Sequence, residues 1–417
     1  MPILIKNIKS LVQVETEPRL CVKGKDMSRL STLENAYLLL KDGKIEAFGG
    51  MEELPSLVMP ILAQEIDAAG KMVFPSWCDP HTHLVYAGSR EGEFVDRIHG
   101  LTYEEIARRG GGILNSARRL HDTSEEELTI QALKRLNEIM HMGTGAVEIK
   151  SGYGLTVEDE LKMLRVVKNL KTLSPLTIKA TFLGAHAIPL EYKQNRSEYI
   201  RLIVEEMIPR VAEEQLAEYC DVFCDRGFFT PEETDIILET GTRYGLKPKI
   251  HANELDYSGG IQVGVKHKAL SVDHLEFTGE EEIETLLASD TMPTLLPSTA
   301  FFLKLVYPPA RRMIEAGLPV ALASDYNPGS SPSGKMSFIL SLACIHMRMS
   351  PEEAINAATI NAAYAMDLSR THGSIAKGKT ANVFITKEIP SYAFMPYSFG
   401  SDLVETVIVH GKIMHNS

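Results

Sequence analysis

The stretch Met72-Val-Phe-Pro-Ser-Trp-Cys-Asp-Pro-His-Thr-His83 joins an apolar run to a group of polar side chains. A short apolar run that contains aromatic and β-branched residues predicts a buried strand over 72–78. His81 and His83 are two positions apart, so in an extended chain their side chains point to the same side. Two imidazoles placed in this way can bind one metal ion together.

Further apolar runs follow along the chain at 145–149, 176–183, 220–224, 247–251, 270–274, 292–296 and 319–324. Amphipathic segments separate these runs. Four of the segments begin with a residue typical of a helix N-cap and an acid in the first turn, at Thr102, Ser124, Thr156 and Thr230. This alternation predicts an α/β fold, a (β/α)8 TIM-type barrel. A doubly wound sheet is the alternative.

Both ends of the chain carry strand patterns, over 3–14, 36–48, 382–386 and 404–414. Neither end is long enough for a sheet domain of its own. We therefore predict that the two ends pair into one small composite β-sandwich domain. The predicted boundaries place its N-terminal part at 1–71, the barrel at 72–372 and its C-terminal part at 373–417.

Composition narrows the class of protein. The chain has 417 residues, with 43 Lys and Arg against 55 Asp and Glu, and a formal net charge of −12. It carries no basic stripe, so we expect no nucleic-acid partner. The 5 cysteines are too few for a disulfide framework and are interpreted as reduced thiols. Neither a signal sequence nor a membrane-spanning run is found, so we expect a cytoplasmic protein without a membrane partner.

The polar residues that follow the strand runs indicate where chemistry takes place, because barrel enzymes build their sites at the carboxyl ends of the strands. Five of the 13 histidines lie at or just beyond such ends: His81, His83, His186, His251 and His274. Asp325 follows the eighth run. His81 and His83, joined by His251 and Asp325, predict a metal site. Imidazole and carboxylate ligands suit zinc, iron, nickel or manganese.

Other residues near these ends are candidates for catalysis and binding. Glu254, three residues beyond His251, could accept a proton from an attacking water and pass it to a leaving nitrogen; the alternative is an acid of a surface loop. His274 could be a ligand or a buried structural residue, but we favour a hydrogen-bond donor to an oxyanion. Arg90 could clamp a carboxylate, unless it is a surface arginine. The loop 327–330 suits an anionic or amide substrate.

Taken together, these motifs resemble the imidazolonepropionase family of the amidohydrolase superfamily over nearly the whole chain. The matching stretches are Asp79-Pro-His-Thr-His-Leu-Val-Tyr-Ala-Gly-Ser-Arg90, Gly110-Gly-Gly-Ile113, Glu148-Ile-Lys-Ser-Gly-Tyr-Gly-Leu155, Phe182-Leu-Gly-Ala-His186, His251-Ala-Asn-Glu254 and Ser324-Asp-Tyr-Asn-Pro-Gly-Ser330. Many relatives have Phe in place of Tyr326, a side chain that we expect to point away from the metal.

The resemblance implies a reaction and a set of residues. The reaction is hydrolysis of the ring C–N amide bond of 4-imidazolone-5-propanoate to N-formimidoyl-L-glutamate, in histidine degradation. One divalent or trivalent ion, zinc or iron, would be held by His81, His83, His251 and Asp325. Substrate would be bound by Arg90, Tyr103, Tyr153, His186, Glu254, Asn327, Gly329 and Ser330. The catalytic residues would be Glu254, His274 and Asp325, with the proton acceptor being either Glu254 or Asp325.

The resemblance also implies a homodimer, and we expect residues 88–115 to close over the substrate. Some amidohydrolases use a carboxylated strand-end lysine to bridge two metals, which makes Lys150 a candidate, although the resemblance points to one metal. Two other functions remain open. The first is a deaminase of the same superfamily acting on guanine or cytosine, and the second is a non-enzymatic assembly protein built on the same barrel.

Overall fold

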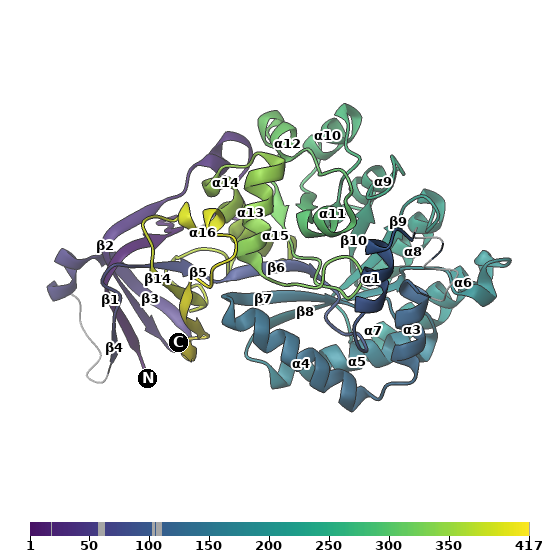
Figure 1. Ribbon diagram of the computed structural model, residues 1–417, viewed down its shortest axis with the longest axis horizontal. Coiled ribbons are helices and arrows are strands. Elements are labelled where there is room, and N and C mark those ends of the chain that lie inside the picture. The colour runs from purple at the N-terminus through teal and green to yellow at the C-terminus, as the bar shows by residue number, and fades with distance from the viewer. Residues whose placement is uncertain (18, 57–62, 102–104, 106–110, 417) are drawn as a thin grey trace.

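The computed structural model describes residues 1–17, 19–56, 63–101, 105 and 111–416. Over these residues the chain forms a barrel surrounded by helices and, beside it, a separate mixed sheet (Figure 1). None of the described helices is long and apolar enough to cross a bilayer.

The barrel is an eight-stranded parallel sheet in which consecutive strands are neighbours. Its strands are β6 (Trp77–Thr82), β7 (Thr144–Lys150), β8 (Thr177–Ala185), β9 (Tyr219–Cys224), β10 (Lys247–Ala252), β11 (Ser271–His274), β12 (Met292–Leu295) and β13 (Ala321–Leu322). The segment after β13 closes the barrel onto β6, because Asp325 N donates to His81 O at 3.0 Å and His83 N donates to Tyr326 O at 2.9 Å. The predicted barrel is therefore confirmed.

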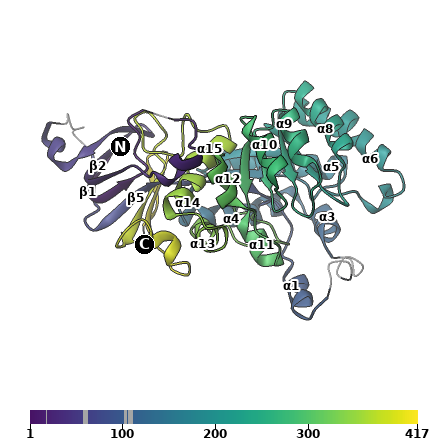
Figure 2. The same cartoon turned by 90° about the horizontal axis from the view of Figure 1, so that it is seen from above.

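Helices cover the outside of the barrel, as the two views of the ribbon show (Figures 1 and 2). The α-helices are α1 (Glu91–Ile98), α3 (Ile113–His121), α4 (Glu125–His141), α5 (Val157–Leu173), α6 (Arg196–Leu202), α7 (Ile208–Glu213), α8 (Pro231–Arg243), α9 (Gly260–Lys266), α10 (Glu280–Leu287), α11 (Pro297–Leu303), α12 (Ala310–Ala316), α13 (Met336–Met347), α14 (Pro351–Ala358), α15 (Ile360–Ala365) and α16 (Phe394–Tyr397). Shorter turns of helix are η1 (Gly24–Ser28), η2 (Met51–Ser56), η3 (Leu190–Tyr192) and the π-type η4 (Ile203–Met207).

Three of the four predicted N-caps are found. The side chains of Ser124, Thr156 and Thr230 each accept a hydrogen bond from the backbone N–H three residues later, at the start of α4, α5 and α8. Each bond satisfies one of the N–H groups that a helix start leaves unpaired. The fourth, Thr102, lies outside the described residues.

The second sheet combines both ends of the chain, as predicted. Its strands are β1 (Ile3–Val12), β2 (Thr32–Lys41), β3 (Lys44–Gly50), β4 (Gln64–Asp67), β5 (Lys71–Pro75), β14 (Val383–Glu388), β15 (Val404–Val409) and β16 (Lys412–Asn416). The N-terminal and C-terminal strands meet where β5 pairs antiparallel with β14, and Figure 1 shows these purple and yellow arrows side by side. Alternate residues of β5 face two cores, since Phe74 packs toward the barrel and Val73 packs within the sheet.

The first predicted barrel strand, over 72–78, is divided between the two sheets. Residues 71–75 form β5 of the mixed sheet, and the barrel strand β6 begins at Trp77. The change takes place at Ser76, whose N–H still bonds to Asn382 O, whereas Trp77 N bonds to Gly143 O. Both halves are apolar because Phe74 and Trp77 pack against the same ring, Phe384, at centroid distances of 5.2 and 5.0 Å. Hydrophobicity therefore gives no sign of the division.

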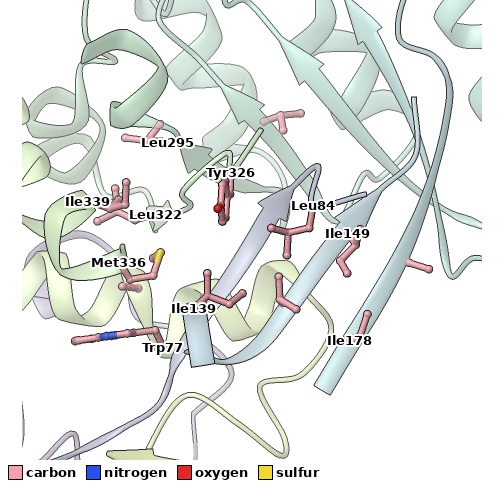
Figure 3. Close-up of a cluster of buried hydrophobic side chains, with 14 of the residues drawn as sticks. Trp77, Leu84, Ile139, Ile149, Ile178, Leu295, Leu322, Tyr326, Met336 and Ile339 are labelled. Atoms are coloured by element: carbon pink, nitrogen blue, oxygen red, sulfur yellow. The ribbon is translucent and has the colours of Figure 1, made fainter. Parts of the chain in front are cut away.

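A continuous apolar core fills the space between the barrel strands and the helices (Figure 3). Tyr326 lies in this core beside Ile139 and donates from its hydroxyl to Glu138 Oε2 of α4 at 3.2 Å. The hydroxyl is thus directed to a covering helix rather than into the barrel. All five cysteines are free thiols, and Cys78, Cys220 and Cys224 are buried.

Candidate metal centre and active site

Four of the five strand-end histidines line one cavity of about 380 Å³, and the fifth, His81, packs against the rings of His83 and His251. His81 and His83 come from the end of β6, His251 and His274 from β10 and β11, and His186 from the residue after β8. All five side chains are buried. A cavity of this volume suits a small molecule. The carboxyl ends of the strands therefore carry the site, as expected for a barrel enzyme.

Three of the four predicted metal ligands, His81, His83 and Asp325, have ligand atoms that all lie within 4.8 Å of one another, and His251 joins them through His83. Nε2 of His83 lies 3.4 Å from Nε2 of His251. Asp325 Oδ1 lies 3.7 Å from His81 Nε2 and 3.6 Å from His83 Nε2. Ligand atoms arranged tetrahedrally at 2.0–2.1 Å from zinc are about 3.4 Å apart. These three printed separations are close to the spacing expected around a single ion.

The hydrogen bonding of the histidines supports this fit. Nδ1 of His81 lies 2.7 Å from Asp273 Oδ2, and Nδ1 of His251 lies 3.0 Å from Asp221 Oδ1. In metal sites a carboxylate on the far nitrogen fixes the tautomer and turns the near nitrogen to the ion. His81 Nε2 is buried and has no hydrogen-bond partner among the described residues. An unpaired buried nitrogen is costly, and a cation would satisfy it.

The histidines are also electrostatically suited to bind a cation. Burial lowers the pKa of His81 and of His83 well below its usual value, and nearby Lys150 and His186 add to the effect. Both imidazoles are therefore neutral near pH 7, with a lone pair available. His186 and His274 lie close enough to the other histidines to form alternative ligand trios, His83 with His186 and His251, or His81 with His251 and His274.

Glu254 is a buried carboxyl beside this centre. Burial, together with the negative charges of Asp325 and Asp225, raises its pKa to about 8. Burial likewise raises the pKa of Asp325 to about 6. A carboxyl group whose pKa lies near the working pH can both accept and return a proton. Glu254 is therefore a candidate general base and acid.

His274 faces Glu254 across the cavity. Its Nδ1 lies 3.8 Å from Glu254 Oε2 and has no hydrogen-bond partner among the described residues. Burial lowers the pKa of His274 well below its usual value, so the ring is a neutral donor. The backbone of His274 has φ of 84°, a left-handed conformation that is strained for a residue other than glycine. The surrounding fold therefore holds this imidazole in place despite the conformational strain of its backbone.

Arg90 lies on the cavity wall at the start of α1. Its Nε and Nη2 donate to Glu93 Oε2 at 2.9 and 2.6 Å, so the guanidinium is held in one orientation. Glu93 Oε1 also accepts from Gly112 N at 3.1 Å, which joins α1 to the start of α3. A Cβ atom at Gly329 would lie 2.2 Å from Arg90 Nη1. A larger residue at this position would displace the guanidinium from its present orientation.

The loop after β13 is organised by Asn327. Its Nδ2 donates to Asp325 O at 2.8 Å and to Ser330 Oγ at 2.7 Å, and its Oδ1 accepts from the backbone N–H of Gly329 and of Ser330. Asn327, Gly329 and Ser330 all line the cavity. Thr299 Oγ1 donates to Asp325 Oδ2 at 2.5 Å and leaves Oδ1 directed toward the histidines.

Two predicted substrate contacts pack against the candidate metal centre. The ring of His186 stacks on that of His83, with centroids 5.2 Å apart, and the ring of Tyr153 lies 5.8 Å from His83. His186 Nδ1 donates to Gly152 O at 2.9 Å. Both side chains line the cavity. The remaining predicted contact, Tyr103, lies outside the described residues.

Sequence reasoning missed the charged residues below the cavity, Glu148, Asp221, Lys249 and Asp273, and also Arg97 on its wall. The available signal was a charged residue inside an apolar strand run, as Asp221 is within 220–224. Lys150, considered as a carboxylated bridge between two metals, instead forms ion pairs with Glu148, Asp221 and Asp273. A carbamate at this nitrogen would add a negative charge among three carboxylates.

Comparisons with known proteins agree with this geometry. Residues 227–414 match the model of the amidohydrolase family. The chain is 59% identical to an imidazolonepropionase of Flavobacterium johnsoniae over 99% of both chains. It is 44% identical to an imidazolonepropionase of Geobacillus kaustophilus, with 100% of this chain and 98% of the relative covered.

Among solved structures, the guanine deaminase of E. coli superposes with a TM-score of 0.74 at 15% identity, covering 100% of this chain and 99% of the other. A 5-methylcytosine deaminase from Klebsiella pneumoniae gives a TM-score of 0.74 at 19% identity, covering 100% and 98%. These two likenesses show the fold alone. The full-length sequence similarity goes further and shows that the chain belongs to the imidazolonepropionase family of amidohydrolases.

Proposed function

We propose that this chain hydrolyses the ring C–N amide bond of 4-imidazolone-5-propanoate to N-formimidoyl-L-glutamate, a step of histidine degradation. The observation that carries the proposal is one cavity that holds both a converging set of imidazoles and a carboxylate and, on its wall, an oriented arginine. The relatives named imidazolonepropionase support the same reaction.

The proposed metal ligands are His81, His83, His251 and Asp325. The cation is zinc or iron, both of which suit imidazole and carboxylate. When bound, it supplies Lewis acidity that lowers the pKa of water and polarises a carbonyl group. The formal charge of the buried side chains also favours a cation at this site. The three carboxylates Glu148, Asp221 and Asp273 exceed the two ammonium groups by one negative charge, and Asp325 adds a second.

Glu254 is the proposed proton carrier. It accepts a proton as the oxygen of water attacks the ring carbonyl carbon, and returns it to the ring nitrogen when the C–N bond breaks. Asp325 beside the ligands is the other candidate acceptor. The products are a carboxylic acid on one side and a formimidoyl nitrogen on the other, so the water molecule is fully accounted for.

His274 and Arg90 stabilise and orient the reacting groups. The neutral His274 ring donates its one N–H to the oxyanion that forms on the attacked carbonyl. Arg90 binds the propionate through two hydrogen bonds, which delivers the ring in one orientation. We assign substrate contacts to Tyr153, His186, Asn327, Gly329 and Ser330 around them. A homodimer and a cytoplasmic location remain predictions.

A direct assay tests the proposal. The purified protein is incubated with 4-imidazolone-5-propanoate, the loss of imidazolone absorbance is followed, and N-formimidoyl-L-glutamate is identified by mass spectrometry. The same protein after prolonged treatment with a chelator is the control. We expect turnover that falls on chelation and returns on adding zinc or iron. Ammonia release from guanine or cytosine without imidazolone turnover would refute the proposal in favour of a deaminase.

A further inference from the structure

A cluster of charged side chains lies inside the barrel, below the cavity, and the proposed reaction does not use it directly. Its members come from four of the barrel strands and have no exposed surface: Glu148 and Lys150 of β7, Asp221 of β9, Lys249 of β10 and Asp273 of β11. Charged groups are buried this completely only when they are paired. The contacts within the cluster therefore show which neighbouring side chain each charged group keeps in position.

Two chains of contacts run from the metal centre down to Lys150. In one, His251 Nδ1 bonds to Asp221, and Asp221 Oδ2 accepts from Lys150 Nζ at 2.7 Å. In the other, His81 Nδ1 lies 2.7 Å from Asp273 Oδ2, which is 3.5 Å from the same Nζ. Two of the four proposed ligands, from strands on different parts of the barrel, are therefore tied to a single ammonium group.

We propose that Lys150 is a positioning residue for the metal centre, which fixes Asp221 and Asp273 so that His251 and His81 turn Nε2 toward the cation. The inference rests on the proposed function. The ammonium group donates hydrogen bonds to Asp221 and to Glu148 Oε1, the latter at 2.7 Å, and Asp273 lies at ion-pair distance from it. Carboxylates that hold ligand histidines affect metal affinity almost as strongly as the ligands themselves.

The charge state of Lys150 agrees with this role. Burial alone would lower its pKa, but Asp221, Glu148 and Asp273 outweigh burial and raise the pKa above its usual value. The side chain is therefore an ammonium ion near neutral pH. It holds the two carboxylates at fixed distances and offsets their repulsion.

Lys249 provides a matched control within the same cluster. It is buried to the same extent and also pairs with Glu148, at Oε2. Its other hydrogen bonds go to the carbonyl oxygens of Pro80 and Ala365, both at 3.2 Å. Among the described residues no hydrogen bond joins it to Asp221 or Asp273. Replacing Lys249 therefore removes a buried ammonium while leaving both contact chains in place.

The experiment compares Lys150→Met with Lys249→Met in the full-length protein. Zn²⁺ affinity is measured by competition with a chromogenic chelator, and thermal unfolding of the metal-free proteins is measured in parallel. We expect Lys150→Met to bind Zn²⁺ about 10- to 100-fold more weakly than the wild type. Lys249→Met should change the affinity less than about threefold, although both variants lower the melting temperature of the metal-free protein.

Two further measurements separate positioning from general damage. The visible spectrum of the Co²⁺-loaded protein reports ligand geometry, and we expect it to change in Lys150→Met but not in Lys249→Met. If Lys150→Met does not fold, Lys150→Gln, which keeps hydrogen-bond donors without the charge, is measured in the same way. Wild-type Zn²⁺ affinity in the Lys150 variant, or an equal loss in both variants, would overturn the inference.

These outcomes are distinct from failure of the proposed function. A wild-type chain that binds Zn²⁺ but does not convert the imidazolone refutes the reaction and leaves the comparison of the two lysines valid. Conversely, a wild-type chain that turns over the imidazolone, with a Lys150→Met variant that binds Zn²⁺ equally well, refutes only the role of Lys150.

Discussion

Replacing Glu254 with glutamine removes a buried ionisable group without changing its size. In the metal-free protein, burial and the charge of Asp325 raise the pKa of Glu254 from 4.5 to about 8. The folded state thus binds this proton more tightly than the unfolded chain. This tighter proton binding adds to the free energy of unfolding. The contribution is fully present below pH 4.5 and is lost as the pH rises toward 8.

The size of this loss follows from the shift. One pKa unit corresponds to about 1.4 kcal/mol, so the rise in the pKa of Glu254 from 4.5 to about 8 sets an upper limit of about 5 kcal/mol on the lost free energy of unfolding. Water that enters the cavity beside the carboxyl group reduces the cost of the charge, and we expect about 1–5 kcal/mol between pH 5 and 9. Glu254→Gln cannot ionise, so the variant does not carry this contribution.

The assay is urea unfolding of both metal-free proteins, followed by circular dichroism at intervals from pH 5 to pH 9. All other titrating groups are shared, so the difference between the two unfolding midpoints isolates Glu254. We expect the variant to gain stability over the wild type as the pH rises. Parallel pH dependences would show that the carboxyl group is not held in its protonated form and would refute the electrostatic reasoning.

The same variant tests the chemical role of Glu254. In the metal-loaded enzyme, loss of the proton carrier should lower kcat by about 10²- to 10⁴-fold. Metal content should stay at the wild-type level, because Glu254 is not among the proposed ligands. Normal turnover by Glu254→Gln would transfer the role to Asp325.

Two other substitutions follow from the same geometry. His274→Ala should lower kcat by about 10²- to 10³-fold with little change in KM, because the donor acts on the oxyanion rather than on bound substrate; steady-state kinetics that remain near normal would contradict this role. Arg90→Ala removes charge-assisted hydrogen bonds worth about 1.5–3 kcal/mol and should raise KM for the propionate substrate about 10- to 150-fold. An imidazolone without the carboxylate serves as the comparison, and equal effects on both compounds would exclude the clamp.

The barrel and the clustering of the strand-end histidines could be predicted because both follow from the periodic apolar runs in the sequence. Buried parallel strands are apolar on both faces, and the polar residues that matter follow directly after them. The division at Ser76 could not be predicted, because the chain leaves one sheet and enters another without a change in hydrophobicity. Phe74 and Trp77 share one packing partner from the far end of the chain, Phe384.

The charged cluster below the cavity was harder to infer for a different reason. Asp221 and Asp273 lie within apolar strands, and their partners His251 and His81 come from different strands, so only the closed barrel brings them into contact. Similarly, the sequence does not show that Glu93 orients Arg90, although the two residues are only three positions apart at the start of a helix. A buried charge within a strand indicates a partner but does not identify it.

The central claim is that His81, His83, His251 and Asp325 hold one cation. The most direct test is an anomalous difference map, recorded at the metal absorption edge from crystals of the purified enzyme after zinc or iron has been identified by elemental analysis. We predict a single peak about 2.0–2.2 Å from Nε2 of each of the three histidines and from Asp325 Oδ1. A peak bound instead by His186 or His274, two peaks, or no peak in a fully active preparation would contradict the account.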